Sequence, residues 1–198
     1  MGSIPISSTS TKIAFGAENR HILSIFRSRR VGHVLVDLGG RFSGMSETED
    51  YVALTRLQSA YADVISRRAW SELDPLFMPQ ALVRIDTVTR EAFELVGPAA
   101  LGEFISTAVQ RFEFFEFVIL NSRCSLYTDG QADKAAARIF MCEVRRDVDT
   151  GDWSTAYGVY HDRYQRVDGT WLFERRDYQS LTRTDGPVFP FPHHLGID

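Results

Sequence analysis

A hairpin signal near the C-terminal end limits the folds open to this chain more than any other motif. Two aromatic-rich runs, residues 154–167 and 170–181, flank the dipeptide Asp168-Gly169. An Asp-Gly pair between two β-rich runs is typical of a two-residue hairpin turn, because both turn positions need positive φ angles. The sequence therefore predicts two long antiparallel strands that meet at this turn.

Further β-rich runs and helical patterns precede the hairpin. The β-rich runs cover residues 81–87, 92–96, 117–126 and 135–145. Apolar residues at three- and four-residue spacing predict a first helix, which Ser46 and Glu49 begin as a capping box. Two shorter helices are expected over residues 71–77 and 98–112. Helices followed by a meander of antiparallel strands predict an α+β domain.

Charge and composition predict a boundary near Met45. Residues 1–44 hold six Lys/Arg and two Asp/Glu and are rich in Ser and Thr, whereas the whole chain has a net charge of −4. This composition fits an organelle transit peptide, a flexible arm, or an upstream extension with Met45 as the functional start. We expect 1–44 to be a flexible extension, 45–185 to be one domain, and 186–198 to be a tail that closes a pocket.

Composition also excludes several classes of protein. The net acidic charge argues against a chain that mainly binds nucleic acid. Two cysteines, Cys124 and Cys142, stand outside any C-x-x-C pair and fit a reduced cytoplasmic setting better than a disulfide framework. Together with His161 they lack the short spacing of metal ligands, so no metal site is expected. No apolar stretch reaches the roughly 18 residues that a membrane helix needs.

Several segments together resemble the SnoaL-like family of the nuclear-transport-factor-two-like superfamily. They are residues 61–62, 67–70, 73–77 and 97–104, Asn121, and a closing hairpin of 158–164 (GVYHDRY) with 168–173 (DGTWLF). The resemblance covers about residues 50–180. It implies a cone-shaped barrel, in which a strongly curved, mixed and mostly antiparallel sheet is covered on its concave face by N-terminal helices. Cavities in such cones bind small molecules.

A more distant resemblance, carried by residues 82–86 and 168–173, is to scytalone dehydratase and its relatives. Those enzymes use an Asp on the first helix with His and Tyr side chains from the sheet. The position that matches the Asp is Ser66, and the position that matches a pocket His is Phe117. Serine and phenylalanine cannot replace an Asp/His acid–base pair. The resemblance thus implies the pocket without that chemistry.

The last predicted strands offer other proton-moving groups. Side chains alternate along a strand, so Tyr160 and Asp162 share the face that the resemblance turns into the pocket. Asp162 is the first candidate for a general base, with its pKa raised by desolvation; the alternative is a salt bridge to a neighbouring Arg. Tyr160 would donate a hydrogen bond to a substrate carbonyl or enolate. His161 falls on the outer face and is a reserve candidate, since a bulge would reverse that parity.

The predicted substrate-binding wall collects residues from helix and sheet. It consists of Tyr61, Ser66, Thr87, Phe117 and Met141. The basic pair Arg145-Arg146 is interpreted as a solvated strand end rather than an anion site.

Two functions remain open from sequence. The first is a cofactor-independent lyase or isomerase that dehydrates, isomerises or cyclises a hydrophobic substrate of polyketide, steroid or terpenoid type. The second is a non-catalytic binding or accessory subunit, which resemblance to the small subunits of ring-hydroxylating dioxygenases would allow. Both need no nucleic acid and no membrane. A partly apolar outer row of Tyr157, Val159 and His161 further predicts a homodimer that pairs through its sheet.

Overall fold

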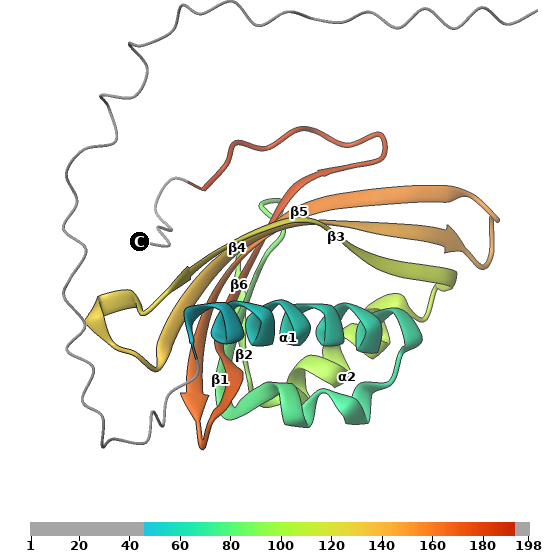
Figure 1. Ribbon diagram of the computed structural model, residues 1–198. Coiled ribbons are helices and arrows are strands. Elements are labelled where there is room, and N and C mark those ends of the chain that lie inside the picture. The colour runs from blue at the N-terminus through green and yellow to red at the C-terminus, as the bar shows by residue number, and fades with distance from the viewer. Residues whose placement is uncertain (1–45, 193–198) are drawn as a thin grey trace, which may run out of the picture. The chain divides into compact units, whose positions relative to one another are not determined.

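The computed structural model describes residues 46–192, which form one curved, six-stranded sheet with helices on its concave side (Figure 1). In chain order the elements are α1 (Glu47–Arg67), the 3-10 turns η1 (Trp70–Glu72) and η2 (Asp74–Leu76), β1 (Phe77–Asp86), β2 (Phe93–Val96), α2 (Gly97–Val109), β3 (Phe112–Leu126), η3 (Thr128–Gly130), β4 (Lys134–Asp147), β5 (Trp153–Val167) and β6 (Thr170–Arg183). The strand order is β2-β1-β6-β5-β4-β3, in which only β1 and β6 are parallel. The predicted α+β fold with a mixed, mostly antiparallel sheet is confirmed, although the sheet curves without closing.

The Asp-Gly hairpin forms as predicted. Asp168 has φ 49° and Gly169 has φ 81°, so both turn positions lie in the left-handed region that this turn type requires. Val167 and Thr170 pair directly on either side. The two strands that this turn joins, β5 and β6, lie at the centre of the sheet.

Helix α1 begins with the predicted capping box. The Ser46 N–H donates to Glu49 Oε2 over 2.6 Å, and the Glu49 N–H donates to Ser46 Oγ over 3.2 Å. Leu54, Tyr61 and Ile65 form part of its buried face. Because this apolar stripe packs against the sheet, α1 covers part of the concave face of the sheet.

A buried carboxylate fixes the start of α1 to the hairpin. Asp50 is fully buried and accepts hydrogen bonds from Trp171 Nε1 over 2.8 Å and from the Tyr127 hydroxyl over 3.0 Å. Arg166 completes the arrangement with an ion pair at 2.7 Å. A buried charge with this many partners is satisfied, so Asp50 has a structural role.

Several predicted boundaries differ from the structure: α2 ends at Val109 rather than at residue 112, and β1 begins at Phe77 rather than at residue 81. The expected helix over residues 71–77 is instead the pair of short turns η1 and η2, because Pro75 has no N–H to continue a helix. Strand β3 begins at Phe112, five residues earlier than expected, where it pairs with the end of β4. The longer β3 and β4 extend the concave face over α2.

The described part of the tail lies on the convex side of the sheet, opposite the helices (Figure 1). The Phe189 N–H donates to the Leu181 carbonyl over 2.8 Å, and the Phe191 ring meets the Phe140 ring at 5.6 Å. Phe140 is directly opposite Val159 in the sheet. Up to residue 192 the tail therefore covers the convex face and not the cavity that it was expected to close; residues 193–198 lie outside the described residues.

The predicted flexible extension, residues 1–44, also lies outside the described residues. Between residues 46 and 192, no helix is both long enough and apolar enough to cross a membrane.

Candidate active site

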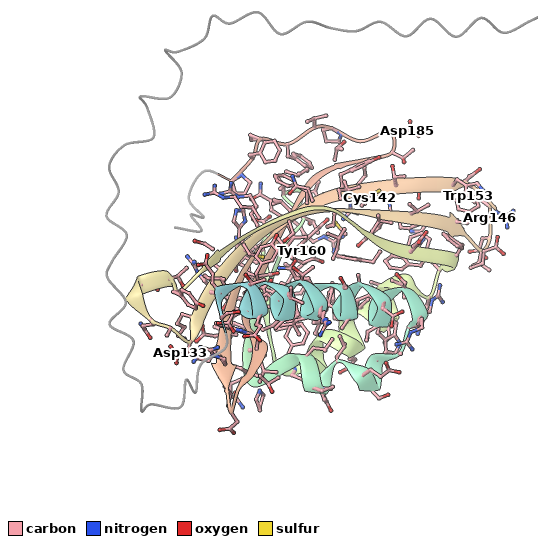
Figure 2. All side chains as sticks on the ribbon, viewed as in Figure 1. Asp133, Cys142, Arg146, Trp153, Tyr160 and Asp185 are labelled. Atoms are coloured by element: carbon pink, nitrogen blue, oxygen red, sulfur yellow. The ribbon has the colours of Figure 1, made fainter. Side chains whose placement is uncertain are left out.

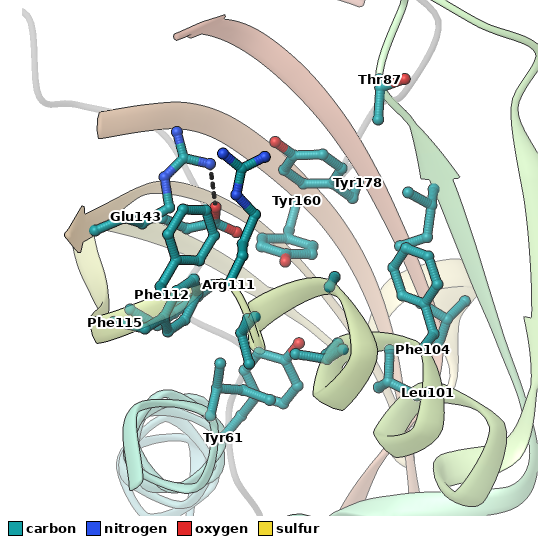
Figure 3. A pocket seen from close by; sticks show the side chains of 18 of the residues that line it. Tyr61, Thr87, Leu101, Phe104, Arg111, Phe112, Phe115, Glu143, Tyr160 and Tyr178 are labelled. Atoms are coloured by element: carbon teal, nitrogen blue, oxygen red, sulfur yellow. Dashed lines mark hydrogen bonds and ion pairs between the residues drawn. The ribbon is translucent and has the colours of Figure 1, made fainter. Parts of the chain in front are cut away.

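A cavity of about 270 Å³ lies between the concave face of the sheet and helices α1 and α2. Its wall is mostly apolar and aromatic, with polar groups at one end (Figure 3). The lining residues are Tyr61, Ile65, Val83, Ile85, Thr87, Leu101, Phe104, Ile105, Ala108, Val109, Arg111, Phe112, Phe115, Phe117, Glu143, Arg145, Tyr160, Tyr178 and Arg183. An apolar hollow with a few convergent polar groups is the usual form of a small-molecule site.

Packed aromatic rings form the inner part of the wall. Phe117 meets Tyr61 edge-on at 5.5 Å, and Tyr160 lies 5.9 Å from Phe117 and 5.2 Å from Tyr178. Tyr160 lies between the sheet and α1 (Figure 2). Burial raises the pKa of Tyr61, Tyr160 and Tyr178 above the usual value, so all three phenols stay protonated near neutral pH and can donate hydrogen bonds.

Gly158 gives Tyr178 its place in the wall. A Cβ on Gly158 would lie 2.3 Å from Cε2 of Tyr178 and 3.0 Å from its hydroxyl oxygen. The Tyr178 ring thus lies directly against the β5 backbone, which only glycine permits. This contact fixes a phenol beside Tyr160 at the cavity wall.

Glu143 supplies the carboxyl group of the cavity. It extends from the inner face of β4, where it is paired with Phe117 of β3, and its side chain is 25% exposed. Burial raises the pKa of Glu143 above its ordinary value, although the positive charges of Arg145 and Arg183 act to lower it. A carboxyl with a raised pKa in an aromatic cavity suits general acid–base chemistry.

This raised pKa can be measured without a substrate. We expect the Glu143 carboxyl to titrate above the ordinary value of 4.5, as followed by the Cδ chemical shift in protein labelled with [¹³C]glutamate. Arg145→Met should move that pKa further up, because it removes a positive charge that favours the carboxylate. Glu72 is the internal control, since its hydrogen bond to Arg67 lowers its pKa. A Glu143 pKa at or below 4.5 would contradict the assignment.

Asp162 lies apart from this cavity wall, in a buried ion pair. Nε of Arg176 donates to its Oδ1 over 2.8 Å and Nη2 donates to its Oδ2 over 2.7 Å. The Tyr164 hydroxyl donates to the same carboxylate over 2.9 Å. Both charged side chains are buried, at 0% and 2% exposure. With its oxygens bound to Arg176 and Tyr164, Asp162 is not open to a substrate in the cavity.

Three aromatic rings enclose the guanidinium of Arg176. Its Cζ lies 4.0 Å from the ring centre of Tyr61, 4.3 Å from Tyr160 and 4.2 Å from Phe173. Burial alone would lower the pKa of Arg176, but the Asp162 carboxylate more than offsets this and raises it. Arg176 thus stays charged, and the rings of Tyr61 and Tyr160, which line the cavity, pack against its guanidinium.

The same buried network continues to α1. Gln58 Nε2 donates to the Tyr164 hydroxyl over 3.0 Å, and the Ser122 hydroxyl donates to Gln58 Oε1 over 2.8 Å. The chain from Asp162 through Tyr164 and Gln58 to Ser122 therefore joins β5, α1 and β3. Asp162, Tyr164 and Gln58 each have hydrogen-bond partners, whereas Nη1 of Arg176 is buried without one in the described part of the chain; the linked side chains fit a structural network.

The two positions that match the dehydratase pair lie next to each other. Ser66 Oγ accepts a hydrogen bond from the Phe117 N–H over 3.0 Å and thereby ties α1 to β3. Phe117 lines the cavity, whereas Ser66 is not part of its wall. At this place the chain has a hydrogen bond between helix and strand and an aromatic ring instead of an acid and a base.

The structure distributes the predicted site residues over three regions. Tyr61, Thr87, Phe117 and Tyr160 line the cavity. Ser66, Met141 and Asp162 lie on the inner side outside its wall. His161 lies on the outer face, where its Nε2 accepts a hydrogen bond from Arg138 Nε over 3.0 Å. Among the described residues, no cluster of three or more His, Cys, Asp or Glu could hold a metal ion.

Sequence reasoning missed Glu143, Arg145 and Tyr178. Glu143 is two residues after Met141, so strand alternation places both on one face, and that signal could have found it. Arg145 follows on the same face; its side chain is 11% exposed, so its interpretation as solvated is wrong. Arg146, 41% exposed and paired with Glu113, is at the surface as predicted. Arg146 and Trp153 lie together at the far end of the β4–β5 hairpin (Figure 2).

Comparisons with known proteins agree with this fold. The family model of the SnoaL-like domain matches residues 46–177. A search among curated proteins finds no significant match to the sequence.

Among solved structures, a scytalone dehydratase-like protein from Novosphingobium aromaticivorans has 21% identity and a TM-score of 0.61 over 75% of this chain and 96% of its own. A type 2 hexachlorocyclohexane dehydrochlorinase has 18% identity and a TM-score of 0.61 over 74% of this chain and 96% of its own. An aromatic ring hydroxylase-like protein from N. aromaticivorans has 21% identity and a TM-score of 0.58 over 70% and 93%. At these identities the likeness concerns the fold.

Proposed function

The chain belongs to the family of SnoaL-like domains, and from this premise we propose that it is a cofactor-independent enzyme that moves a proton on a small hydrophobic molecule. Its reaction is of lyase or isomerase type: a dehydration, an isomerisation or a cyclisation. The single observation that carries the proposal is Glu143, a carboxyl with a raised pKa at the wall of an aromatic cavity. Two of the similar structures carry the names of a dehydratase and a dehydrochlorinase. They support this reaction class by analogy of fold.

Glu143 acts first as the base. Its carboxylate removes a proton from carbon next to a substrate carbonyl, and the electrons of the broken C–H bond move onto the carbonyl oxygen as an enolate. Tyr160 and Tyr178, kept protonated by burial, donate hydrogen bonds to that oxygen. Because a neutral phenol donates to the enolate more strongly than to the ketone, it lowers the barrier.

The protonated Glu143 then acts as the acid. In an isomerisation it returns the proton to a different carbon; in a dehydration it gives the proton to a leaving hydroxyl, which departs as water. Both routes restore the starting enzyme and need no electron acceptor. Glu143 therefore takes the base role that the sequence suggested for Asp162, whose oxygens Arg176 and Tyr164 occupy.

A binding or accessory subunit is the second candidate. The observation that favours it is the Ser66–Phe117 contact, where the dehydratase pattern would have an acid and a base. In that case the protein binds a ligand in the cavity and catalyses no reaction on it. The two candidates differ in whether the bound molecule is converted.

Untargeted mass spectrometry in D₂O tests the proposal. The purified protein is incubated with a lipophilic cell extract, with protein carrying Glu143→Gln as the matched control. We expect one compound to decrease while another appears, either lighter by one water or of equal composition with added deuterium. Retention of a compound that the wild-type protein leaves chemically unchanged and free of deuterium would instead support the binding subunit.

The oligomeric state, the domain boundary, the location and the substrate class of this protein stay predictions. A homodimer through the outer row would bring two convex faces together, although Val159 is already buried at 0% exposure and the tail packs close by. The domain boundary at Met45, a cytoplasmic location, and a polyketide-, steroid- or terpenoid-like substrate also remain proposals.

A further inference from the structure

One end of the cavity carries more positive than negative charge. Among the described residues its wall includes Arg111, Arg145 and Arg183 but only one acid, Glu143. Arg111 is neutralised by Asp147, whose Oδ2 lies 2.6 Å from Nη2 of Arg111. Two guanidinium groups thus remain beside a single carboxyl, which has a raised pKa.

Arg145 is the more buried of the two. Its side chain is 11% exposed, and its only ion pair among the described residues is a long one, 3.5 Å from Nη1 to Glu143 Oε2. Its Nε is buried and has no hydrogen-bond partner in the described part of the chain. Burial lowers the pKa of Arg145, against the opposing effect of Glu143. A buried guanidinium with an unused donor is costly unless an acceptor meets it.

Arg183 lies at the rim. It is exposed, comes from the end of β6, and forms no ion pair with any acid of residues 46–192. A second hollow of about 350 Å³ opens beside the first and shares Arg111, Phe112, Arg145 and Arg183 with it. Its own acids are Asp147, which is bound to Arg111, and the exposed Asp152. Arg145 and Arg183 therefore lie where the cavity meets a hollow that is lined mostly by polar and charged residues.

The opposite end of the cavity is apolar. Leu101, Phe104 and Ile105 of α2 form that end together with Val83 and Ile85 of β1. Figure 3 shows Leu101 and Phe104 on the side of the cavity away from Glu143 and Phe112. A ligand that fills the whole cavity thus meets apolar side chains at one end and guanidinium groups at the other.

We propose that the ligand of this cavity is an amphipathic acid, with a carboxylate bound by Arg145 and Arg183 and an apolar body held against α2 and β1. The carboxylate offers two acceptor oxygens, which match the fork of donors on an arginine. It would accept from the guanidinium groups of Arg145 and Arg183 and place the apolar body past Tyr160 and Tyr178. This inference rests on the proposed function in one respect, namely that the cavity is the ligand site.

A displacement experiment tests the charge preference. N-phenyl-1-naphthylamine, an uncharged dye that fluoresces in apolar sites, reports on the cavity. Two competitors of nearly equal size displace it: 2-naphthoate, which carries a carboxylate, and 2-naphthalenemethanol, which does not. We expect the wild-type protein to bind 2-naphthoate about tenfold more tightly than the alcohol, the scale of one charge-assisted hydrogen bond.

Single variants assign the preference to the two arginines. Arg145→Met should abolish the preference for 2-naphthoate, and Arg183→Met should reduce it, while the alcohol keeps its affinity within about twofold. Arg56→Met is the matched control, because Arg56 is exposed on α1 and absent from the cavity wall. Thermal unfolding of each variant shows that it is folded at the assay temperature.

Each outcome decides the matter. Equal affinity of the two competitors for the wild-type protein, or a preference that survives Arg145→Met, would overturn the acid-binding inference and leave the cavity as a site for neutral molecules. Failure of the dye and both competitors to bind would overturn the cavity as a ligand site, and with it the proposed function. An equal loss of both competitors in Arg145→Met would mean that the side chain only shapes the wall.

Discussion

Replacing Asp162 by Asn should lower the free energy of unfolding by about 3–5 kcal/mol, the usual cost of leaving one partner of a buried ion pair without the other. Asn can still accept a hydrogen bond from Tyr164, but the Arg176 guanidinium would lose its one carboxylate partner within residues 46–192. The three rings around Arg176 hold the cation in place without supplying an acceptor. Urea unfolding followed by circular dichroism measures the change.

Two further variants make that result specific. Asp63→Asn breaks an exposed ion pair with Arg67 and should leave the unfolding midpoint almost unchanged, because solvent screens that pair. The double variant Asp162→Asn/Arg176→Met removes both buried charges and should recover much of the loss. If Asp162→Asn were as mild as Asp63→Asn, the buried pair would not be the structural element described above.

Replacing Glu143 by Gln should leave the stability almost unchanged and lower the activity. The amide keeps the shape of the side chain and can still accept from Arg145, so we expect the protein to stay folded. It can neither take up nor return a proton, and kcat should fall by about a hundredfold to ten-thousandfold, the range of general acid–base catalysis. KM should change little, because the group acts mainly in the transition state.

The pH dependence of wild-type turnover provides a second readout. Because the base must be ionised, kcat/KM should rise with pH through the pKa of Glu143, which burial places above the ordinary 4.5. Loss of activity in Glu143→Gln with an unchanged fold and an unchanged KM would fit this role. A variant with wild-type kcat would exclude it.

The architecture was readable from the sequence because local signals agreed with each other. The capping box at Ser46, the Asp168-Gly169 turn and the alternation of β5 and β6 all depend on neighbours in the chain. The short turns before β1 were misread as one helix, since the apolar spacing was helical and Pro75 was given too little weight.

Which arginine pairs with Asp162 depends on a register shift in the β5–β6 hairpin, and the sequence gives no sign of that shift. A regular hairpin through Asp168-Gly169 would place Arg175 opposite Asp162. A register shift between Arg163 and Tyr164 moves the pairing by one residue and brings Arg176 to that place instead. Because one residue changes the face, the same shift turns Arg176 into the core and leaves Arg175 on the outside with Asp177.

The position of the cavity was also set by long-range geometry. Strand alternation correctly grouped Met141 with the inner face, but Met141 is completely buried in the core. The cavity begins two residues further along β4, where Glu143 and Arg145 line its wall. The curvature of the sheet arises from all six strands together. The pattern of a single strand therefore predicts which face of the sheet a side chain is on, but not whether that side chain is in the core or at the cavity.

The most direct test of the account compares turnover by two variants on the same identified substrate. Glu143→Gln should lose at least about a hundredfold in kcat, whereas the charge-free double variant Asp162→Asn/Arg176→Met, assayed below its unfolding midpoint, should keep kcat within about tenfold of the wild type. The reverse pattern, with full activity in Glu143→Gln and none in the folded double variant, would contradict the assignment of the proton transfer to Glu143.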